Sequence, residues 1–595
     1  MSLIVQKFGG TSVADAEKIS AAARRALRAQ QQGHQVVMVV SAMGKNTDML
    51  VNLAKQVCDQ PPAREMDMLL STGEQVSVAL MAMAIHNLGG KAVSLTGGQI
   101  GVKTDSSHTK ARIRSISTER MRRLLREGNV VIAAGFQGVD DDLNITTLGR
   151  GGSDTSAVAL AAVLGAEMCE IYTDVDGVFT TDPRLIAEAR KMSNVSHDEM
   201  LELASLGAGV MHSRSIEFGK KFNVPIHVRN SGVFTDEPGT IIGPIPESEN
   251  RTVSGCALTK AEARITVSKV PHQPGVSLTI FERLASVHVA VDMIMQTASH
   301  DGHADISFTV LESDLGPALE AVEQAASALG AGDVLHAANV AKVSVVGLGM
   351  ATQSGVADRM FRALAEADVN IEAITTSAIK VSCLVGREQG LEALRAVHTE
   401  FELGRPPSGR ATFADSLVAT KKAKDTDAMA VVNRLQSMED LTVHGVEFDD
   451  SQALITLSDV PDTPGISADI FEAVAAGGHL VDMIVQGIGA NSKTNLSFTV
   501  PQAHVQQAAA AVGNVVDKLG CDVQSRDSIA ILSVTGIGIR SHTGVGLRMF
   551  GALSQAGINI ELVNTSEVKV NVVVDGSKGP DGLAALKKVF ADVIG

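Results

Sequence analysis

Two glycine-rich segments of this 595-residue chain have the composition of anion-binding loops. The first, Lys7-Phe8-Gly9-Gly10-Thr11-Ser12, follows an apolar run and precedes a helical pattern. Glycines let backbone N–H groups approach an anion closely, and the start of a helix adds a partial positive charge. Lys7 adds a full charge. The segment therefore predicts a phosphate site without Walker spacing, although a tight turn with a surface lysine explains the same residues.

The second segment reads TTLGRGGSD and runs from Thr146 to Asp154. It also precedes a helix, for which Ser153 or Asp154 is a candidate N-cap, and a simple capped turn is the structural alternative. An arginine between glycines, here Arg150, is well placed to bind a carboxylate through two hydrogen bonds. The two loops together favour an anion site.

Other polar residues lie in shorter patterns. Glu74, in the segment STGE, is either a helix cap or a counter-charge for a substrate ammonium group. Ser41 and Thr47 flank a glycine turn and are equally explained as caps. The segments TDVDGV and TDPR are typical of turns, but their acids would also suit Mg²⁺ or a ribose, and their arginine a phosphate. The residues of interest there are Thr173, Asp174, Asp182 and Arg184.

Composition excludes several classes of protein. The formal net charge of −16, with no Trp and one Tyr, argues against a phosphate-backbone binder and against base-stacking platforms. No apolar run approaches the ~18 residues of a membrane-spanning helix, and no export signal is evident. Five scattered cysteines without metal-type spacing indicate a reducing, cytoplasmic compartment. His86, His197 and His212 have no metal-type partners, so we assign them no catalytic role and predict no protein-held metal.

The elements that must position the loops follow an α/β pattern over residues 1–245. Apolar runs predict strands at 2–8, 35–41, 91–96, 130–136, 169–175 and 225–228. They alternate with helical patterns at 14–32, 47–58, 63–89, 112–127, 154–165 and 198–221. This alternation predicts a mostly parallel sheet between helices. Ligands of such sheets bind beyond the carboxyl ends of the strands.

The remainder of the chain is a tandem duplication. Residues 274–296 match 464–486 at a shift of 190, and residues 355–381 match 544–570 at a shift of 189. Each repeat divides into two modules with the ferredoxin-like order of strands and helices. The second and fourth modules lack a final strand, which we expect 253–258 and 443–448 to supply. We predict domains at 1–245, 246–401 and 429–595, with a polar linker at 402–428.

The motifs KFGGTS, STGE, GRGGSDTSA and TDVDGVFTTDPR, in this order, resemble those of aspartate kinases in the amino-acid kinase superfamily. The four modules resemble ACT modules, the amino-acid-sensing units that follow the kinase domain in that family. The resemblance covers essentially the whole chain. It implies transfer of the ATP γ-phosphoryl group to the β-carboxylate of L-aspartate, giving 4-phospho-L-aspartate. This is the first step toward lysine, threonine and methionine.

The resemblance also implies roles for residues. Lys7 would stabilise the transferring phosphoryl group with the amides of Gly9 and Gly10, and Asp154 would orient Lys7 or the substrate amine. Arg150 would bind the substrate α-carboxylate and Glu74 its ammonium, in a pocket lined by Ser41, Thr47 and Ser153. The nucleotide, with Mg²⁺ bridging its phosphates, would contact Thr173, Asp174, Asp182, Arg184, Gly209 and Val210. Many relatives have a lysine at the position of Gly209, so a side-chain contact there is lost.

The ACT resemblance implies feedback inhibition by lysine, threonine or both, at interfaces between paired modules. Candidate residues are Asp292 and Gln296 with Asn370 and Ile371, and Asp482 and Gln486 with Asn559 and Ile560. The repeats differ, since Ala351-Thr352-Gln353 replaces Arg540-Ser541-His542, and we expect unequal effector preferences. The family implies a homodimer through the ACT modules. Another amino-acid kinase, or a catalytically silent sensor, are the competing functions.

Overall fold

The computed structural model describes residues 2–207, 210–233, 238–248, 250–298, 302–351, 353, 355–409, 411, 415, 438–439, 441–488, 493–539 and 544–594. The chain divides into two compact units, and neither is continuous in sequence. The kinase unit consists of residues 1–179, 191–248 and 409–440. The regulatory unit consists of residues 180–190, 249–408 and 441–595. The boundaries expected at 245 and 402 lie close to two changes of unit, but residues 180–190 and 409–440 belong to units that these boundaries do not predict.

An eight-stranded sheet forms the centre of the kinase unit. Its strand order is β10-β12-β11-β9-β1-β2-β6-β3, and every described pair is parallel except β11 with β12. These strands are β1 (Leu3–Phe8), β2 (Gln35–Val40), β3 (Ala92–Leu95), β6 (Val130–Ala134), β9 (Met168–Thr173), β10 (Asn194–Ser196), β11 (Ile226–Asn230) and β12 (Thr240–Gly243). A smaller sheet of order β5-β4-β7-β8 comprises β4 (Val102–Thr104), β5 (Ile113–Ile116), β7 (Gln137–Val139) and β8 (Ile145–Thr147).

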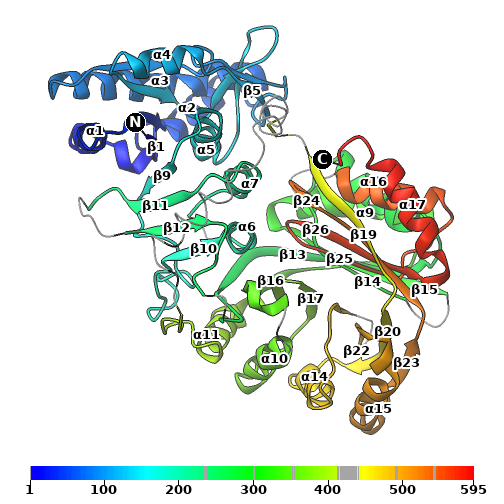
Figure 1. Ribbon diagram of the computed structural model, residues 1–595. Coiled ribbons are helices and arrows are strands. Elements are labelled where there is room, and N and C mark those ends of the chain that lie inside the picture. Colours follow the sequence, from blue (N-terminus) through cyan, green and yellow to red (C-terminus); the bar gives the residue numbers. More distant parts are fainter. Residues whose placement is uncertain are drawn as a thin grey trace. The chain divides into compact units, whose positions relative to one another are not determined.

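Seven described helices accompany these sheets (Figure 1). They are α1 (Ala16–Gln31), α2 (Asn46–Val57), α3 (Ala63–Asn87), α4 (Glu119–Arg126), α5 (Gly152–Leu164), α6 (His197–Ser205) and α7 (Ser213–Lys221). The predicted parallel sheet is confirmed, and all six predicted strands form. The helix expected over 112–127 was wrong in its first half, because 113–116 is strand β5. The helix expected over 198–221 is two helices, α6 and α7.

Helix α3 corrects one expectation from composition. It is long and apolar enough to cross a membrane, with a mean hydropathy of 1.4 over its most apolar window, half of which is buried inside the structure. No long apolar run marks it in the sequence, because polar residues, including Ser71 and Glu74, interrupt its apolar runs. Core helices of folded proteins also meet this criterion.

Two long strands are shared between modules in the first repeat of the regulatory unit. They are β13 (Gly255–Pro271) and β16 (Val334–Val346). The start of β13 pairs with the end of β16, from Gly255 opposite Val346 to Thr259 opposite Lys342. The remaining elements of this repeat are α8 (Val276–Ser286), β14 (Asp292–Ala298), β15 (His303–Leu311), α9 (Leu315–Leu329), α10 (Val356–Glu366), β17 (Ala373–Ser377), β18 (Lys380–Gly386) and α11 (Gly390–Glu400).

The second repeat has the same order of elements. They are β19 (Thr442–Asp449), β20 (Gln452–Pro461), α14 (Ile466–Ala476), β21 (Ile484–Ile488), β22 (Lys493–Pro501), α15 (Val505–Val516), β23 (Asp522–Arg526), β24 (Ile529–Ile537), α16 (Gly544–Gln555), β25 (Leu562–Thr565), β26 (Lys569–Asp575) and α17 (Gly579–Val589). Strand β19 lies beside β24, as Figure 1 shows. The prediction that 253–258 and 443–448 donate strands to modules two and four is therefore confirmed by the pairing of β13 and β19.

The four modules associate in a nested order. We number them by their helices: α8 and α9 belong to module one, α10 and α11 to module two, α14 and α15 to module three, α16 and α17 to module four. Modules two and three are joined where β17 pairs with β21. Modules two and three share one apolar core, and modules one and four share a second. A third core contains residues of all four modules.

The same aromatic contact is made at each junction. The rings of Phe361 and Phe471 are 5.4 Å apart between modules two and three. The rings of Phe281 and Phe550 are 5.8 Å apart between modules one and four. Phe281 corresponds to Phe471 and Phe361 to Phe550 in the duplicated sequence. Each junction therefore unites the first module of one repeat with the second module of the other.

Candidate active site and regulatory pockets

An ion pair between Lys7 and Asp154 lies at the carboxyl end of the central strand β1. Only 8% of Lys7 is exposed, so its ammonium group sits in a largely water-free position. Asp154 belongs to the first turn of α5, where the helix dipole favours a carboxylate. Asp154 thus neutralises Lys7 and holds it at the carboxyl ends of the strands, where ligands of parallel sheets bind.

The glycines after Lys7 allow a second loop to pack closely. A Cβ on Gly10 would lie 2.7 Å from the carbonyl oxygen of Ala42, and Gly44 N–H donates to the Gly10 carbonyl at 3.0 Å. Ser41 N–H donates to the Phe8 carbonyl at 3.1 Å. The Lys7–Ser12 segment and the turn from Ser41 are therefore one packed unit.

Glu74 is joined to the same turn. Its carboxylate accepts a hydrogen bond from Ala42 N–H at 3.0 Å, and its other oxygen, Oε2, is buried without a hydrogen-bond partner in the structure. A Cβ on Gly73 would lie 2.8 Å from that of Ala42, which explains why a glycine precedes Glu74. Burial raises the pKa of Glu74 to about 7, against a stabilising hydrogen bond from Ala42. The free oxygen is suited to a cationic group.

Glu74 is not a helix cap, because it lies in the middle of α3. Ser41 and Thr47 do not cap α2 either: its N-cap position is occupied by Lys45, and no side chain caps it. The capping alternatives proposed for these three residues are therefore wrong. Tertiary packing against the 41–44 turn, rather than helix termination, determines where they lie.

The GRGGSD segment forms a tight turn into α5. Its N-cap is Gly151, with a φ of 71°, and neither Ser153 nor Asp154 caps the helix. A Cβ on Gly151 would lie 2.3 Å from that of His212, so the glycine is required by packing as well as by its left-handed backbone. Arg150 is exposed and has no partner among the residues that the structure describes. Its guanidinium group is available to a ligand.

The residues predicted to bind nucleotide fall in different units. Thr173 ends β9 beside β1, and its hydroxyl donates to Asp174 at 3.1 Å. Asp182 and Arg184 form an exposed ion pair of 2.7 Å in the regulatory unit's 180–190 segment. Each of these two side chains is therefore already paired with the other in this structure. Val210 lies just before α7, and Gly209 falls outside the described residues.

Asp67 is a residue that the sequence analysis overlooked. It is fully buried and accepts hydrogen bonds from the hydroxyl of Thr147, at 2.5 Å, and from His108 and Thr109. It thereby ties α3 to the start of the GRGGSD segment. No local pattern marks it, since an acid within a helix normally faces solvent. His197, by contrast, is buried with its pKa lowered to about 4 by desolvation, and it packs rather than reacts.

Comparison with known proteins identifies the family of the chain. The amino acid kinase family model matches residues 2–230, and the ACT domain model matches 265–326, 343–401, 458–515 and 532–590. Aspartate kinase of Stutzerimonas stutzeri is 49% identical over 414 residues, covering 69% of this chain and all of that protein. The chain belongs to the aspartate kinase family. Like its relatives it is an ATP-dependent kinase.

Solved aspartate kinases share the architecture. The enzyme from Synechocystis is 39% identical, with a TM-score of 0.51, and the match covers 99% of this chain and 98% of that one. Aspartokinase III of E. coli matches 67% of this chain and 99% of its own at 23% identity and a TM-score of 0.58, which supports the fold. It was solved with aspartate and ADP, and separately with lysine and aspartate.

Each ACT junction of this aspartate kinase contains the same hydrogen-bonded chain. Between modules two and three, Ser467 donates to Gln486 at 3.0 Å, and Gln486 donates to the Ile371 carbonyl at 3.2 Å. Between modules one and four, Ser277 donates to Gln296 at 2.8 Å, and Gln296 to the Ile560 carbonyl at 2.6 Å. The expected grouping of Gln296 with Ile371 is thus wrong. Equivalent residues meet across repeats.

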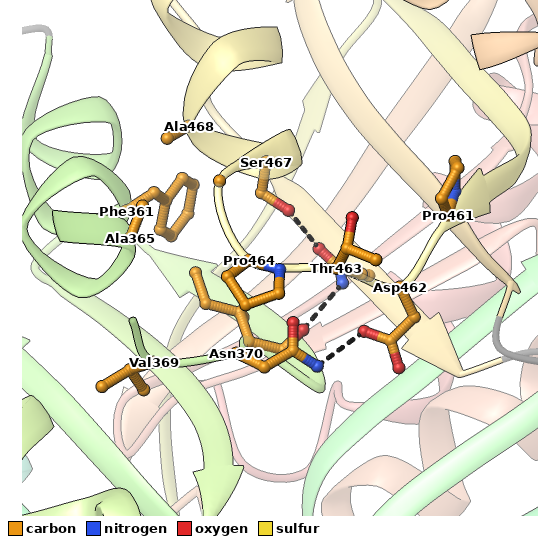
Figure 2. A pocket seen from close by; sticks show the side chains of 13 residues that line it. Phe361, Ala365, Val369, Asn370, Pro461, Asp462, Thr463, Pro464, Ser467 and Ala468 are labelled. Carbon is orange, nitrogen blue, oxygen red and sulfur yellow. Dashed lines mark hydrogen bonds between the residues drawn. The ribbon is translucent and has the colours of Figure 1, made fainter. Parts of the chain in front are cut away.

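The junction of modules two and three is drawn in Figure 2. Asn370 donates to Asp462 at 2.9 Å, next to Pro464 and Ser467 at the start of α14. The cavity among these residues has a volume of about 10 Å³. This is room for about one water, so the side chains themselves fill the pocket.

A larger cavity, of about 310 Å³, lies at the other end of the same junction. Asp482 lines it, together with His479, Ser377 and Gln452. His479 Nδ1, Ser377 Oγ and Gln452 Oε1 are buried there without hydrogen-bond partners in the structure. Asp292, the counterpart of Asp482 in the first repeat, instead forms a 2.5 Å ion pair with the buried Lys342. The two repeats are therefore chemically unequal at this position.

Proposed function

We propose that the chain transfers the γ-phosphoryl group of ATP to the β-carboxylate of L-aspartate and so catalyses the first step toward lysine, threonine and methionine. The observation that carries this proposal is the Lys7–Asp154 ion pair together with Glu74, which has one oxygen unused and accepts a hydrogen bond from Ala42, the residue that packs on Gly10. A cation for phosphoryl oxygens and an anion for a substrate ammonium are thus available at one sheet edge. E. coli aspartokinase III, which shares this fold, binds aspartate and ADP.

In the proposed reaction a β-carboxylate oxygen of aspartate attacks the γ-phosphorus. The new O–P bond forms as the bond from the γ-phosphorus to the bridging oxygen of ADP breaks, and ADP leaves with that electron pair. The attacking carboxylate is already ionised at neutral pH, so no general base is needed. Lys7 stabilises the negative charge on the transferring group, with the amides of Gly9 and Gly10. Asp154 keeps Lys7 oriented.

Substrate aspartate would be held by opposite charges. Arg150 binds the α-carboxylate, because its exposed guanidinium group has two parallel N–H donors to offer. Glu74 binds the ammonium group through its unused oxygen. Ser41, Thr47 and Ser153 line the pocket. Glutamate is longer by one methylene group, so its charges would meet Arg150 and Glu74 at the wrong spacing. Acetylglutamate has no free ammonium group for Glu74 to bind.

The nucleotide would lie over the carboxyl end of β9. Thr173 and Asp174 contact it there, with backbone contacts from Val210 and Gly209, while Asp182 and Arg184 would have to exchange their mutual ion pair for the nucleotide. Bound Mg²⁺ would supply positive charge that offsets the negative charge of the ATP phosphates. No cluster of three or more His, Cys, Asp or Glu occurs among the residues that the structure describes.

The test is ATP-dependent ADP release with L-aspartate, L-glutamate or N-acetylglutamate as acceptor, for the native protein and for Lys7→Ala. Turnover with aspartate alone that is lost in Lys7→Ala supports the proposal. Turnover with another acceptor would identify a different amino-acid kinase. Absence of turnover with all three would make the chain a sensor.

We further propose that lysine, threonine or both inhibit the enzyme through the ACT junctions. E. coli aspartokinase III has been solved with lysine. The 310 Å³ cavity offers three unpaired polar atoms and the carboxylate of Asp482. The small pocket at Asn370 and Ile371, and its counterpart at Asn559 and Ile560, would have to open, with Gln486 or Gln296 released to bind the effector.

Effector binding is tested by calorimetry on the full chain with lysine and with threonine. Isolated repeats cannot be used, because each junction combines modules of both repeats. Unequal repeats predict two classes of site with different ligand preference. A single class with equal affinity for one ligand would contradict this.

We also propose a cytoplasmic homodimer. Modules two and three already pair with each other within one chain, through β17 and β21, so this pairing needs no second chain. Exposed apolar side chains follow a helical spacing on α2 (Met49, Leu53) and α3 (Val76, Leu80, Met83). Light scattering of the native protein and of Met83→Lys tests this face: a dimer that persists unchanged in the variant would exclude it, and cell fractionation tests the location.

A further inference from the structure

The chain between the two repeats returns to the kinase unit. Residues 409–440 belong to that unit, and two described sites hold them there. At the first, Ala411 N–H donates to the Glu247 carbonyl at 2.8 Å, and the Asn194 side chain donates to the Ala411 carbonyl at 2.8 Å. The second site lies around Met438 and Glu439.

At the second site the contact is ionic and buried. The Glu439 side chain is 6% exposed and forms a two-pronged ion pair with Arg214, which is 16% exposed. Glu439 also accepts a hydrogen bond from Ile113 N–H, and Met438, only 1% exposed, donates its N–H to the Arg114 carbonyl at 3.4 Å. Both residues thus clasp strand β5. A buried charge pair of this geometry is costly to break by removing one partner.

Arg214 connects Glu439 to the GRGGSD turn. The same guanidinium group donates to the carbonyl of Leu148, immediately before Gly149 and Arg150, and to that of Ala111 at 2.6 Å. Leu148 is buried, and its N–H donates to the Phe136 carbonyl at 2.8 Å. The start of the turn is therefore fixed by Arg214 on one side and by Phe136, which lies between β6 and β7, on the other.

The turn itself has little freedom elsewhere. Gly149 and Gly151 have φ values of 77° and 71°, and a Cβ on Gly149 would lie 2.9 Å from the Thr109 carbonyl oxygen. The direction in which Arg150 points consequently depends on where Leu148 is held. Arg214 sets that position, and Glu439 neutralises and orients Arg214.

We propose that Glu439 is a positioning residue for substrate binding: acting through Arg214, it holds the Leu148–Gly151 turn so that Arg150 can grip the α-carboxylate of aspartate. The proposal rests on the proposed role of Arg150. It makes Glu439, which lies between the two repeats in the sequence, a contributor to the aspartate site. Since Glu439 precedes β19 by three residues, it also provides a covalent route from that strand to the turn.

The test uses the full chain with Glu439→Gln, which preserves size and removes charge, and with Arg214→Lys, which keeps the charge but cannot reach all its acceptors. In both, the KM for aspartate should rise about tenfold while the KM for ATP and kcat change less than about twofold, since binding of one substrate is lost. Amide hydrogen exchange at residues 148–152 should accelerate. The matched control is Glu65→Gln, which removes an exposed acid paired with Arg64 on α3. It should change neither the KM for aspartate nor the exchange at residues 148–152.

Two outcomes would overturn the proposal. One is unchanged exchange at 148–152, which would show that Glu439 does not hold the turn. The other is faster exchange with an unchanged KM for aspartate, or with equal changes for both substrates. Arg150→Ala distinguishes this failure from that of the proposed function: if it too leaves the KM for aspartate unchanged, the role of Arg150 is wrong, whereas a large rise leaves that role intact. If Glu439→Gln does not fold, Arg214→Lys carries the same test.

Discussion

The burial of Glu74 predicts a conflict between substrate binding and stability. Its pKa is raised from 4.5 to about 7 by desolvation, because only 4% of the residue is exposed. The folded protein therefore holds the Glu74 proton more tightly than the unfolded chain does. Stability must fall as the pH rises through this range, and the loss is complete above the folded pKa.

The size of the effect follows from the shift. At 1.36 kcal/mol per pKa unit, ionising Glu74 costs the folded protein about 3 kcal/mol, most of which accrues between pH 5 and pH 8. Glu74→Gln retains an acceptor for Ala42 N–H and never carries the charge. Compared with the native protein, we expect the variant to gain about 2–3 kcal/mol of unfolding free energy on going from pH 5 to pH 8.

The assay is urea unfolding of both proteins at pH 5 and pH 8, with the KM for aspartate measured at pH values from 6 to 8.5. The native KM should fall as Glu74 ionises near pH 7 and binds the ammonium group. In Glu74→Gln the KM should be about 10-fold or more higher at pH 8, from the loss of a charged hydrogen bond, and should no longer depend on this ionisation. The variant would thus be more stable and bind substrate more weakly.

Two results would refute this reasoning. If the difference in unfolding free energy is the same at pH 5 and pH 8, the carboxyl group is not desolvated as described. If stability behaves as expected but the KM for aspartate is unaffected, Glu74 is a buried acid without a role in binding the ammonium group. Glu65→Gln, on the same helix but exposed, is the control and should alter neither quantity.

Three further predictions concern other sites. Lys7→Ala should lower kcat about 10²- to 10³-fold with a normal circular dichroism spectrum, and near-native turnover would contradict its role. Gly73→Ala should cost about 1–3 kcal/mol of unfolding free energy, because the new methyl group meets Ala42 at 2.8 Å; an unchanged urea midpoint would show that α3 shifts freely. Gln486→Ala and Gln296→Ala should weaken inhibition by different amino acids in activity assays, and identical inhibition profiles would contradict inequality of the junctions.

Much of the fold was predictable because the local pattern of apolar residues indicates its strands and helices. The strands β1, β2, β6 and β9 are short apolar runs, and the duplication is visible as constant shifts of 189 and 190. Even the donated strands could be inferred, since a module with a missing strand leaves one edge to be completed. The error at 112–127 arose where a helix and a strand share one polar stretch.

The long-range associations could not be read in this way. Nothing in the local sequence indicates that Gln296 meets Ile560, 264 positions away, rather than Ile371 in its own repeat. Likewise Glu439 and Arg214 are ordinary surface-type residues in a polar context, and only the return of the chain to β5 buries them. Pattern identifies elements, whereas the choice of partner depends on which complementary surfaces meet.

The nested association of the modules changes what mutation can do. In a symmetric assembly of identical subunits, one substitution appears at every equivalent junction at once. Here the junction of modules one and four and that of modules two and three are built from different residues of one chain. Each can drift toward its own ligand while the other is preserved. Because both junctions form within a single chain, their assembly does not weaken on dilution, so the proposed binding of effectors at either junction would not depend on enzyme concentration.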